Sequence, residues 1–266
     1  MPATDLPEET RVRRFLNDQG GPHWYAGVLL LLIAGAAMRP AGAAQAVAGS
    51  LGLASDNVYR GISLDAGRPA WVADLHYAIG SDWIIGIGAG SERTRHRAPG
   101  AQLTAYLDRR WQVDGDWAAK VGAVHYDSSA GIYGRRRYDE LNAAIGWRGR
   151  WQLTLALSPD MYGPYSLYAQ RRHGVVTWVE TTWHQPLAAR LAIDAGVGYA
   201  DLERIHARSY GYANLGFSYG LGDTVLYASR IWTGPRRTVA APAYGAYYQT
   251  DIPAHSRWVA SLIWTF

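Results

Sequence analysis

Hydrophobic and polar residues alternate with a period of two through most of the chain, in runs bounded by Gly, Pro, Asp and Ser. Successive side chains of a β-strand point to opposite faces, so this alternation predicts strands with one apolar and one polar face. Each run has about ten residues, the length that a tilted strand needs to cross a bilayer. The pattern predicts twelve strands, at residues 49–60, 70–79, 83–91, 102–112, 117–127, 138–148, 151–161, 174–184, 190–200, 209–219, 224–232 and 256–266.

The connections between these strands alternate between short and long. The short ones are turns at residues 80–82, 113–116, 149, 185–186 and 220–223. The long ones cover residues 61–69, 92–101, 128–137, 162–173, 201–208 and 233–255. Short periplasmic turns and long extracellular loops are typical of transmembrane β-barrels. The expected fold is therefore all-β, a closed antiparallel transmembrane barrel of twelve strands.

Tryptophans mark the ends of several predicted strands. Those that flank short turns are Trp83, Trp111, Trp117, Trp147 and Trp151. Indole rings prefer the headgroup level of a bilayer, so we expect an aromatic belt at this end of the barrel. A soluble barrel with a Trp-rich core is the alternative interpretation.

The N-terminal region is typical of an exported chain. Three of residues 11–14 are arginines, an apolar run follows at 24–37, and Ala-Gln-Ala occupies 44–46. A basic region, a short apolar segment and an A-x-A site make up a secretory signal peptide. We therefore expect a signal peptide at residues 1–46, cleaved after Ala46, and a barrel at residues 47–266. An anchor that stays attached is the alternative.

The C-terminal run ends on an aromatic residue. Trp264 and the final Phe266 share the apolar face of the last predicted strand. A terminal aromatic of this kind is the signal that the barrel-assembly machinery reads in the last strand of outer-membrane barrels. We expect Trp264 and Phe266 to serve as that signal, with the assembly machinery as a partner.

Composition narrows the chemistry further. The chain has no Cys, so a disulfide or a thiolate metal site is excluded, and its histidines show no metal-binding spacing. It also has no glycine-rich phosphate loop and no dinucleotide-binding motif. We expect no cofactor, no metal ion and no catalytic residues. Nucleic-acid binding is not expected, because the basic clusters do not belong to a groove-reading element.

One stretch resembles a known family. Residues 49–77 read GSLGLASDNVYRGISLDAGRPAWVADLHY, with Ser-Asp at 55–56, Arg-Gly-Ile-Ser at 60–63 and Pro-Ala at 69–70. This resembles the opening of the TorF family of porins, which are Gram-negative outer-membrane proteins. The family pattern has an aromatic residue after Ser-Asp, where this chain has Asn57. The resemblance implies a bacterial outer-membrane pore without specifying its solute.

The polar face of each predicted strand should line the barrel interior. A charge on the lipid face costs about 2–4 kcal/mol near the midplane, so charged strand residues are assigned inward. The first predicted strand then has Tyr59 facing outward and Asp56 and Arg60 facing inward, where we expect these two to pair. The predicted pore-lining residues are Asp56, Arg60, Asp74, His76, Asp108, Arg110, Lys120, Glu140, Arg148, Asp160, Glu180, His184, Arg190, Asp194 and Arg257. Arg230 is ambiguous.

Two interpretations of these interior charges remain open. They can form cross-barrel salt bridges that hold the barrel and partly plug it, or line a pore that selects solutes by charge. We expect a porin-like channel that passes small hydrophilic solutes through a narrow charged lumen. The alternative is a closed barrel without conductance that is structural or interacts with lipopolysaccharide.

The long connections are rich in arginine, for example at residues 93–97 and 135–137. Arg binds phosphate in a bidentate manner, so these loops could contact lipopolysaccharide, attract anionic solutes, or remain solvated. Outer-membrane lipid and lipopolysaccharide are the expected surroundings.

A lipid hydrolase is the rival class of protein, with Ser256, His255 and Asp251 as its candidate catalytic residues. Adjacent strand residues such as His255 and Ser256 face opposite ways, which argues against a catalytic pair.

Overall fold

The computed structural model describes residues 47–93, 99–129, 136–162, 173–205, 209–234 and 256–266. The expected signal peptide at residues 1–46 therefore lies outside the described residues. The wall strands are β1 (Val47–Ala54), β4 (Ala70–Ile79), β5 (Trp83–Arg93), β6 (Pro99–Gln112), β7 (Trp117–Ser128), β8 (Arg136–Trp147), β9 (Trp151–Tyr162), β10 (His173–Pro186), β11 (Leu191–Asp201), β12 (Tyr210–Leu221), β13 (Thr224–Thr233) and β14 (Arg257–Thr265). Two short strands, β2 (Val58–Tyr59) and β3 (Ile62–Ser63), and a 3-10 turn, η2 (Glu203–Ile205), complete the described elements.

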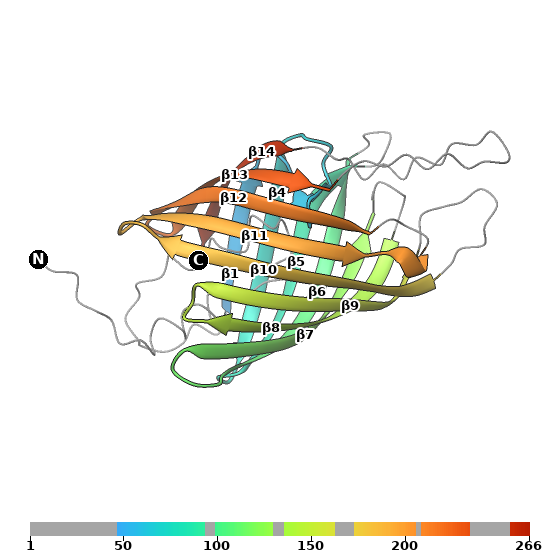
Figure 1. Ribbon diagram of the computed structural model, residues 1–266, viewed down its shortest axis with the longest axis horizontal. Coiled ribbons are helices and arrows are strands. Elements are labelled where there is room, and N and C mark those ends of the chain that lie inside the picture. The colour runs from blue at the N-terminus through green and yellow to red at the C-terminus, as the bar shows by residue number, and fades with distance from the viewer. Residues whose placement is uncertain (1–46, 94–98, 130–135, 163–172, 206–208, 235–255) are drawn as a thin grey trace, which may run out of the picture.

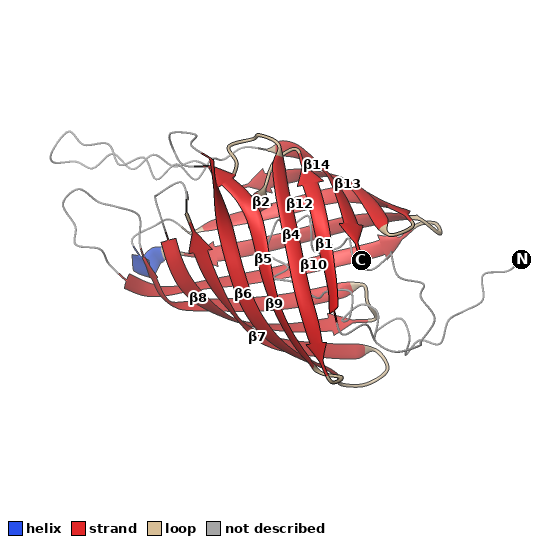
Figure 2. Ribbon diagram, turned by 180° about the vertical axis from the view of Figure 1, so that it is seen from behind, coloured by secondary structure: helices blue, strands red, loops and turns tan. Residues whose placement is uncertain are grey.

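The twelve wall strands form one closed barrel (Figures 1 and 2). Each pairs antiparallel with its neighbours in chain order, and β1 closes the barrel by pairing with β14, where Ser50 faces Thr265. The predicted fold class is confirmed, and most strand ends lie within a few residues of their expected positions. Short turns gather at one end of the barrel, and the strand ends that lead into the longer connections lie at the other (Figure 1).

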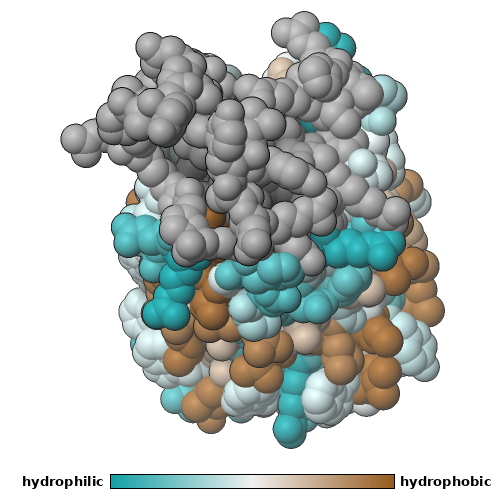
Figure 3. Space-filling view, turned by 90° about the vertical axis from the view of Figure 1, so that its right-hand side faces the viewer, coloured by the Kyte–Doolittle hydropathy of each residue, from teal (hydrophilic) through white to brown (hydrophobic). Residues whose placement is uncertain are grey.

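The barrel is apolar outside and polar inside. Large hydrophobic side chains are exposed on its outer wall, and in the end view of Figure 3 hydrophobic residues appear in brown below a band of hydrophilic ones. Among those exposed on the wall are Leu51, Leu53, Leu75, Ile85, Ile87, Leu103, Leu141, Leu155, Val197, Leu215, Phe217 and Trp258. On the same strands, buried charged residues such as Asp108, Lys120 and Glu140 face the interior. This is the inverse of a water-soluble barrel and the arrangement that lipid requires.

Pairs of tryptophans lie on the outer surface beside the short turns. Trp117 and Trp147 have ring centroids 6.2 Å apart, and Trp151 and Trp183 have centroids 6.0 Å apart. They sit at the ends of strands that the short turns join. This position matches the aromatic belt expected at one headgroup level.

The largest departure from the expected strands follows β1. The predicted first strand ran to residue 60, but β1 ends at Ala54 and the chain then turns into the barrel. Tyr59, expected to face outward, instead packs against the interior aromatic cluster, so that prediction was wrong. The backbone gives the reason: Arg60 and Gly61 have φ values of 48° and 80°, which reverse the chain direction.

No helix in the described part of the chain is long and apolar enough to cross a membrane. Within that same part, no group of three or more His, Cys, Asp or Glu side chains is placed to hold a metal ion.

Candidate functional site

The segment between β1 and β4, residues 55–69, folds into the barrel and is called the inward hairpin here. Its two short strands pair through Val58 with Ser63 and Tyr59 with Ile62. A two-residue loop with positive φ at both positions is typical of a type I′ turn, the tightest hairpin connection. Arg60 therefore lies at the tip of the hairpin, pointed into the barrel.

The base of the inward hairpin is tied to the barrel wall by polar contacts. Asp56 accepts a hydrogen bond from Arg257 on β14 at 2.5 Å and another from Ser63 at 2.7 Å. Asp65 accepts one from the Ser91 hydroxyl on β5 at 2.6 Å. Burial raises the pKa of the Asp65 carboxyl above its ordinary value, while the Ser91 hydrogen bond and the charge of Arg93 oppose that rise.

The tip is held by a bidentate ion pair. The Arg60 guanidinium donates to both carboxylate oxygens of Glu140 on β8, at 2.8 and 3.0 Å. These side chains are only 2% and 0% exposed. The guanidinium carbon also lies 4.1 Å from the ring centroid of Trp178 on β10, and 4.8 Å from that of Tyr59. Charge-assisted fork geometry and a cation–π contact thus act on the same group.

A second carboxylate lies near this pair. Glu180, on the inner face of β10, is buried and accepts a 2.5 Å hydrogen bond from the hydroxyl of Tyr212 on β12. The charge of Arg60 is within electrostatic reach of Glu180, and so is that of Glu140. The hairpin tip therefore brings one cation to a wall region that carries two carboxylates.

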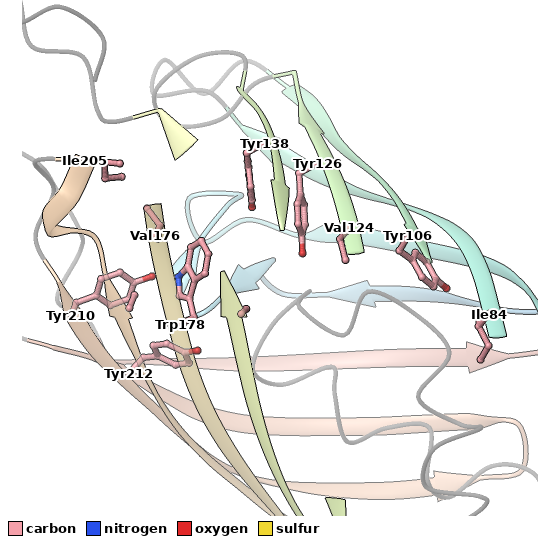
Figure 4. Packing of buried hydrophobic residues seen from close by; sticks show 12 residues of the cluster. Ile84, Tyr106, Val124, Tyr126, Tyr138, Val176, Trp178, Ile205, Tyr210 and Tyr212 are labelled. Carbon is pink, nitrogen blue, oxygen red and sulfur yellow. The ribbon is translucent and has the colours of Figure 1, made fainter. Parts of the chain in front are cut away.

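Two apolar clusters pack the hairpin on opposite sides. Val58 packs in a cluster whose other members lie on β13 and β14. Tyr59 and Ile62 pack against a larger cluster, half of whose buried members are aromatic and whose side chains are seen in Figure 4. Thr233 on β13 also donates a 2.7 Å hydrogen bond to the Gly61 carbonyl. The inward hairpin thus reaches across the lumen from one wall to the other.

Gly61 is required at the tip by space as well as by backbone conformation. A Cβ at this position would lie 2.7 Å from the Tyr212 Cβ and 3.0 Å from the Thr233 hydroxyl oxygen. These distances are shorter than side chains tolerate. The hairpin tip is therefore seated closely against β12 and β13.

A second charged cluster lies on β4, β6 and β7. Asp108 faces Lys120, whose ammonium nitrogen is 3.4 Å away, and Arg110, whose nearest guanidinium nitrogen is 3.5 Å away. Nearby, Asp74 lies 2.8 Å from the ring of His76 and accepts a hydrogen bond from the Tyr106 hydroxyl. These six charged or titratable residues form a polar wall inside the barrel.

The opposite wall carries a further pair. His184 on β10 contacts Asp194 on β11 at 2.5 Å, and Asp194 is fully buried. Polar side chains without charge, such as Gln152, Thr154 and Asn214, occupy inward positions on this side. The interior therefore carries acids and bases around its circumference, most of them in pairs.

Most of the sequence-predicted interior residues do face the interior. Those on wall strands are Asp74, His76, Asp108, Arg110, Lys120, Glu140, Glu180, His184, Asp194 and Arg257. Asp56 and Arg60 also lie inside, on the inward hairpin. Their expected pairing with each other was wrong, because Asp56 pairs with Arg257 and Arg60 with Glu140.

Three of the predicted residues are not placed in the interior. Arg148 and Arg190 lie in short turns and are exposed, because β8 ends at Trp147 and β11 begins only at Leu191. Asp160 is 68% exposed and pairs with His173 near the long-loop end of the barrel. The register between β9 and β10 shifts at this point, so the alternation no longer carries Asp160 to the inner face.

Arg230, which the sequence left ambiguous, lies on the outer side of β13. Its guanidinium contacts the exposed ring of Trp258 and donates a hydrogen bond to Ser256. Ser256, a candidate residue of the hydrolase hypothesis, is thus engaged with Arg230. The other two candidates, His255 and Asp251, lie outside the described residues.

Trp178 is an interior residue that the sequence analysis did not identify. Its ring packs against Arg60 inside the barrel. The signal was present, because Trp178 is two residues from Glu180 and alternation places both on one face. Glu92, buried with a 2.6 Å hydrogen bond from Ser128, was also missed, because the predicted strand ended at residue 91.

No protein-family model matches this chain, and no curated protein matches it. The TorF resemblance therefore stays a prediction.

Several solved structures match in fold. One, from a study of the in-meso crystallization of membrane proteins, has a TM-score of 0.51 and 8% identity, with 83% of each chain covered. The KdgM porin has a TM-score of 0.48 and 7% identity, covering 82% of this chain and 99% of its own. The NanC porin has a TM-score of 0.47 and 11% identity, covering 83% of this chain and 98% of its own.

Proposed function

We propose that this protein is a porin-like channel of the bacterial outer membrane. It would pass small hydrophilic solutes passively through a narrow, charged lumen. The observation that carries the proposal is the inverted distribution of side chains, with an apolar outer wall and charged residues such as Asp108, Lys120 and Glu180 inside. A barrel with this distribution is stable in lipid and offers solutes a polar path.

The inward hairpin makes that path narrow. A barrel of this strand number has a limited interior, and the hairpin occupies part of it between β13–β14 and the aromatic cluster. Solutes must pass beside the hairpin or displace it. Selectivity would then depend on the charges near its tip, Arg60, Glu140 and Glu180.

A closed barrel without conductance is the second candidate. The burial of Val58 and Arg60 favours it, because both side chains are packed as closely as a protein core. In that case the interior charges serve to hold the hairpin, and the protein acts at the membrane as a structural or lipopolysaccharide-interacting element.

Single-channel recording in a planar bilayer separates the two candidates. The refolded chain of residues 47–266 would be compared with a variant in which a Gly-Gly link replaces residues 56–65. The channel proposal predicts discrete steps from the unmodified chain and larger steps from the variant. Steps from the variant alone would identify the native barrel as closed. A folded variant without steps would overturn the channel proposal.

The remaining sequence predictions belong with this proposal. A cleaved signal peptide at residues 1–46 would deliver the chain to the periplasm. The C-terminal strand, with Trp264 and Phe266, would be read by the barrel-assembly machinery. Outer-membrane lipid and lipopolysaccharide would surround the barrel. Cell fractionation and N-terminal sequencing of the mature protein test these points directly.

A further inference from the structure

We propose that Glu140, Trp178 and Glu180 form a binding site for a guanidinium cation, which the chain's own Arg60 occupies in this structure. We call these three residues the guanidinium socket. The inference rests on the proposed channel function and names its solute class: small molecules that carry a guanidinium group. Such a solute would compete with Arg60 for the socket and thereby release the hairpin tip.

The geometry of the socket fits a planar, forked cation. Glu140 accepts two parallel hydrogen bonds from Arg60, at 2.8 and 3.0 Å, and Trp178 lies 4.1 Å from the guanidinium carbon. A guanidinium group satisfies both contacts at once, because it presents paired N–H donors in its plane and a flat face above it. An ammonium group is a compact point charge and cannot make the bidentate contact.

The carboxylates of Glu140 and Glu180 give the socket a negative charge that a cation can balance. Glu140 and Glu180 place two buried carboxylates near a single guanidinium. Tyr212 donates a hydrogen bond to one oxygen of Glu180. Without Arg60, these two acids would remain buried with no cation supplied by the hairpin tip. A solute cation that takes the place of Arg60 restores that balance.

Unpartnered polar groups lie beside the socket. Asn142 is the next inward position after Glu140 on β8, and Ser158 faces inward on β9, between the two socket strands. Among the described residues, neither amide atom of Asn142 nor the hydroxyl of Ser158 has a hydrogen-bond partner, although both side chains are buried. Buried polar groups are normally satisfied, so these atoms can bind the remainder of a guanidinium-bearing solute.

The tip of the hairpin carries backbone strain that its base does not show. Arg60 is not a glycine, yet it adopts a φ of 48°, a conformation that disfavours side chains. The base, by contrast, is fixed through Asp56 to Arg257 and through Asp65 to Ser91. A competing guanidinium would take over the contacts of Arg60 with the socket while the base stays anchored.

The test uses chemical rescue of a variant with an empty socket. Arg60→Gly removes the cation and keeps the turn, because glycine adopts positive φ without strain. The refolded variant in detergent micelles would be heated with and without millimolar methylguanidinium, and the midpoint of unfolding measured. We expect methylguanidinium to raise the midpoint of Arg60→Gly. We expect no rise in Arg60→Gly/Glu140→Gln, which lacks the bidentate acceptor, or in the wild type, whose socket is filled.

Ethylammonium and urea serve as comparison ligands. Loss of one hydrogen bond to a charged group should weaken ethylammonium binding by about tenfold or more. Urea tests whether the planar shape alone suffices without charge. An equal rise with ethylammonium, or an equal rise in the double variant, would overturn the guanidinium site.

A folded Arg60→Gly barrel that methylguanidinium does not stabilise would also overturn it. If that variant does not refold, Arg60→Asn takes its place, since Asn also tolerates this φ. The readout does not depend on conductance. A barrel that conducts but does not bind methylguanidinium would contradict only the guanidinium site. A barrel that binds methylguanidinium but does not conduct would contradict only the channel proposal.

Discussion

Arg60 and Glu140, 80 residues apart in the chain, form the buried bidentate pair that joins the tip of the inward hairpin to the barrel wall. Both side chains are almost fully withdrawn from solvent. Removing one member of such a pair leaves the other charge buried with fewer partners, and that cost exceeds the net contribution of the intact pair.

Glu140→Gln should therefore lower the free energy of unfolding by about 3–5 kcal/mol, as measured by denaturant unfolding in detergent or lipid. Asp116→Asn is the matched control, since it breaks the ion pair with Arg148, which is 50% exposed. An exposed pair contributes at most about 1 kcal/mol. Equal effects of the two substitutions would show that the Arg60–Glu140 pair does not hold the hairpin.

Gly61→Ala should loosen the hairpin tip and increase single-channel conductance. Its Cβ would meet the Tyr212 Cβ at 2.7 Å, so the tip must move away from β12. Gly67→Ala is the control, because Gly67 has a similar φ, 75° against 80°, but a Cβ there meets nothing within 4 Å. The two variants share the backbone strain, and only Gly61→Ala has the clash. Equal conductance of both would argue against the hairpin as the constriction.

Gly86→Ala should destabilise the barrel itself. A Cβ on the inner face of β5 at this position would lie 2.2 Å from the ring of Tyr106, which fills the space above it. We expect a loss of about 1–3 kcal/mol from overpacking. Gly115→Ala, in a short turn where a Cβ meets nothing within 4 Å, should change stability by only a few tenths of a kcal/mol. A neutral Gly86→Ala would mean that Tyr106 is free to move.

Leu155→Arg tests whether the outer wall faces lipid. Leu155 is 54% exposed near the middle of β9, and an arginine there should cost about 2–4 kcal/mol in lipid vesicles. Val113 is similarly exposed, at 57%, but lies in a short turn outside the wall. Val113→Arg should therefore be close to neutral, and an equal, small effect at both positions would contradict the membrane assignment.

Removal of Phe266 should impair barrel assembly while leaving export intact. The Phe266 backbone exchanges two 3.0 Å hydrogen bonds with Gly49 on β1, and its ring contacts Trp264 at a centroid distance of 4.9 Å. Heat-modifiable migration in gels measures the folded fraction in the outer membrane. Phe266→Ala keeps the backbone bonds and isolates the contribution of the ring. Normal migration of both variants would reject the assembly role of this residue.

The wall strands could be predicted from the sequence because their outer face is mainly apolar. Most residues on that face, such as Leu155 and Trp264, are apolar, so alternation records the strand over most of its length. The same rule identified Lys120 and Glu180 as interior residues. It failed at Arg148 and Arg190, where a charged residue beyond a strand end continues the alternation without belonging to the wall.

The inward hairpin could not be predicted by alternation alone. Residues 55–60 continue the period of two, so Tyr59 and Arg60 looked like further positions of the first strand. The local signal of the change is the Arg60-Gly61 dipeptide, whose positive φ values build a tight turn. The partner of Arg60 has no local signal, because Glu140 reaches it only through closure of the barrel.

The contact between Asp56 and Arg257 joins residues 201 positions apart, beside the place where β1 meets β14. All other wall pairings join strands that are neighbours in chain order, but this contact needs both the first and the last strand. Contacts between such distant residues are the slowest to form, because the intervening chain must be ordered first. The barrel therefore stays open until β14 is in place, and the base of the inward hairpin is fastened to the wall only at that step.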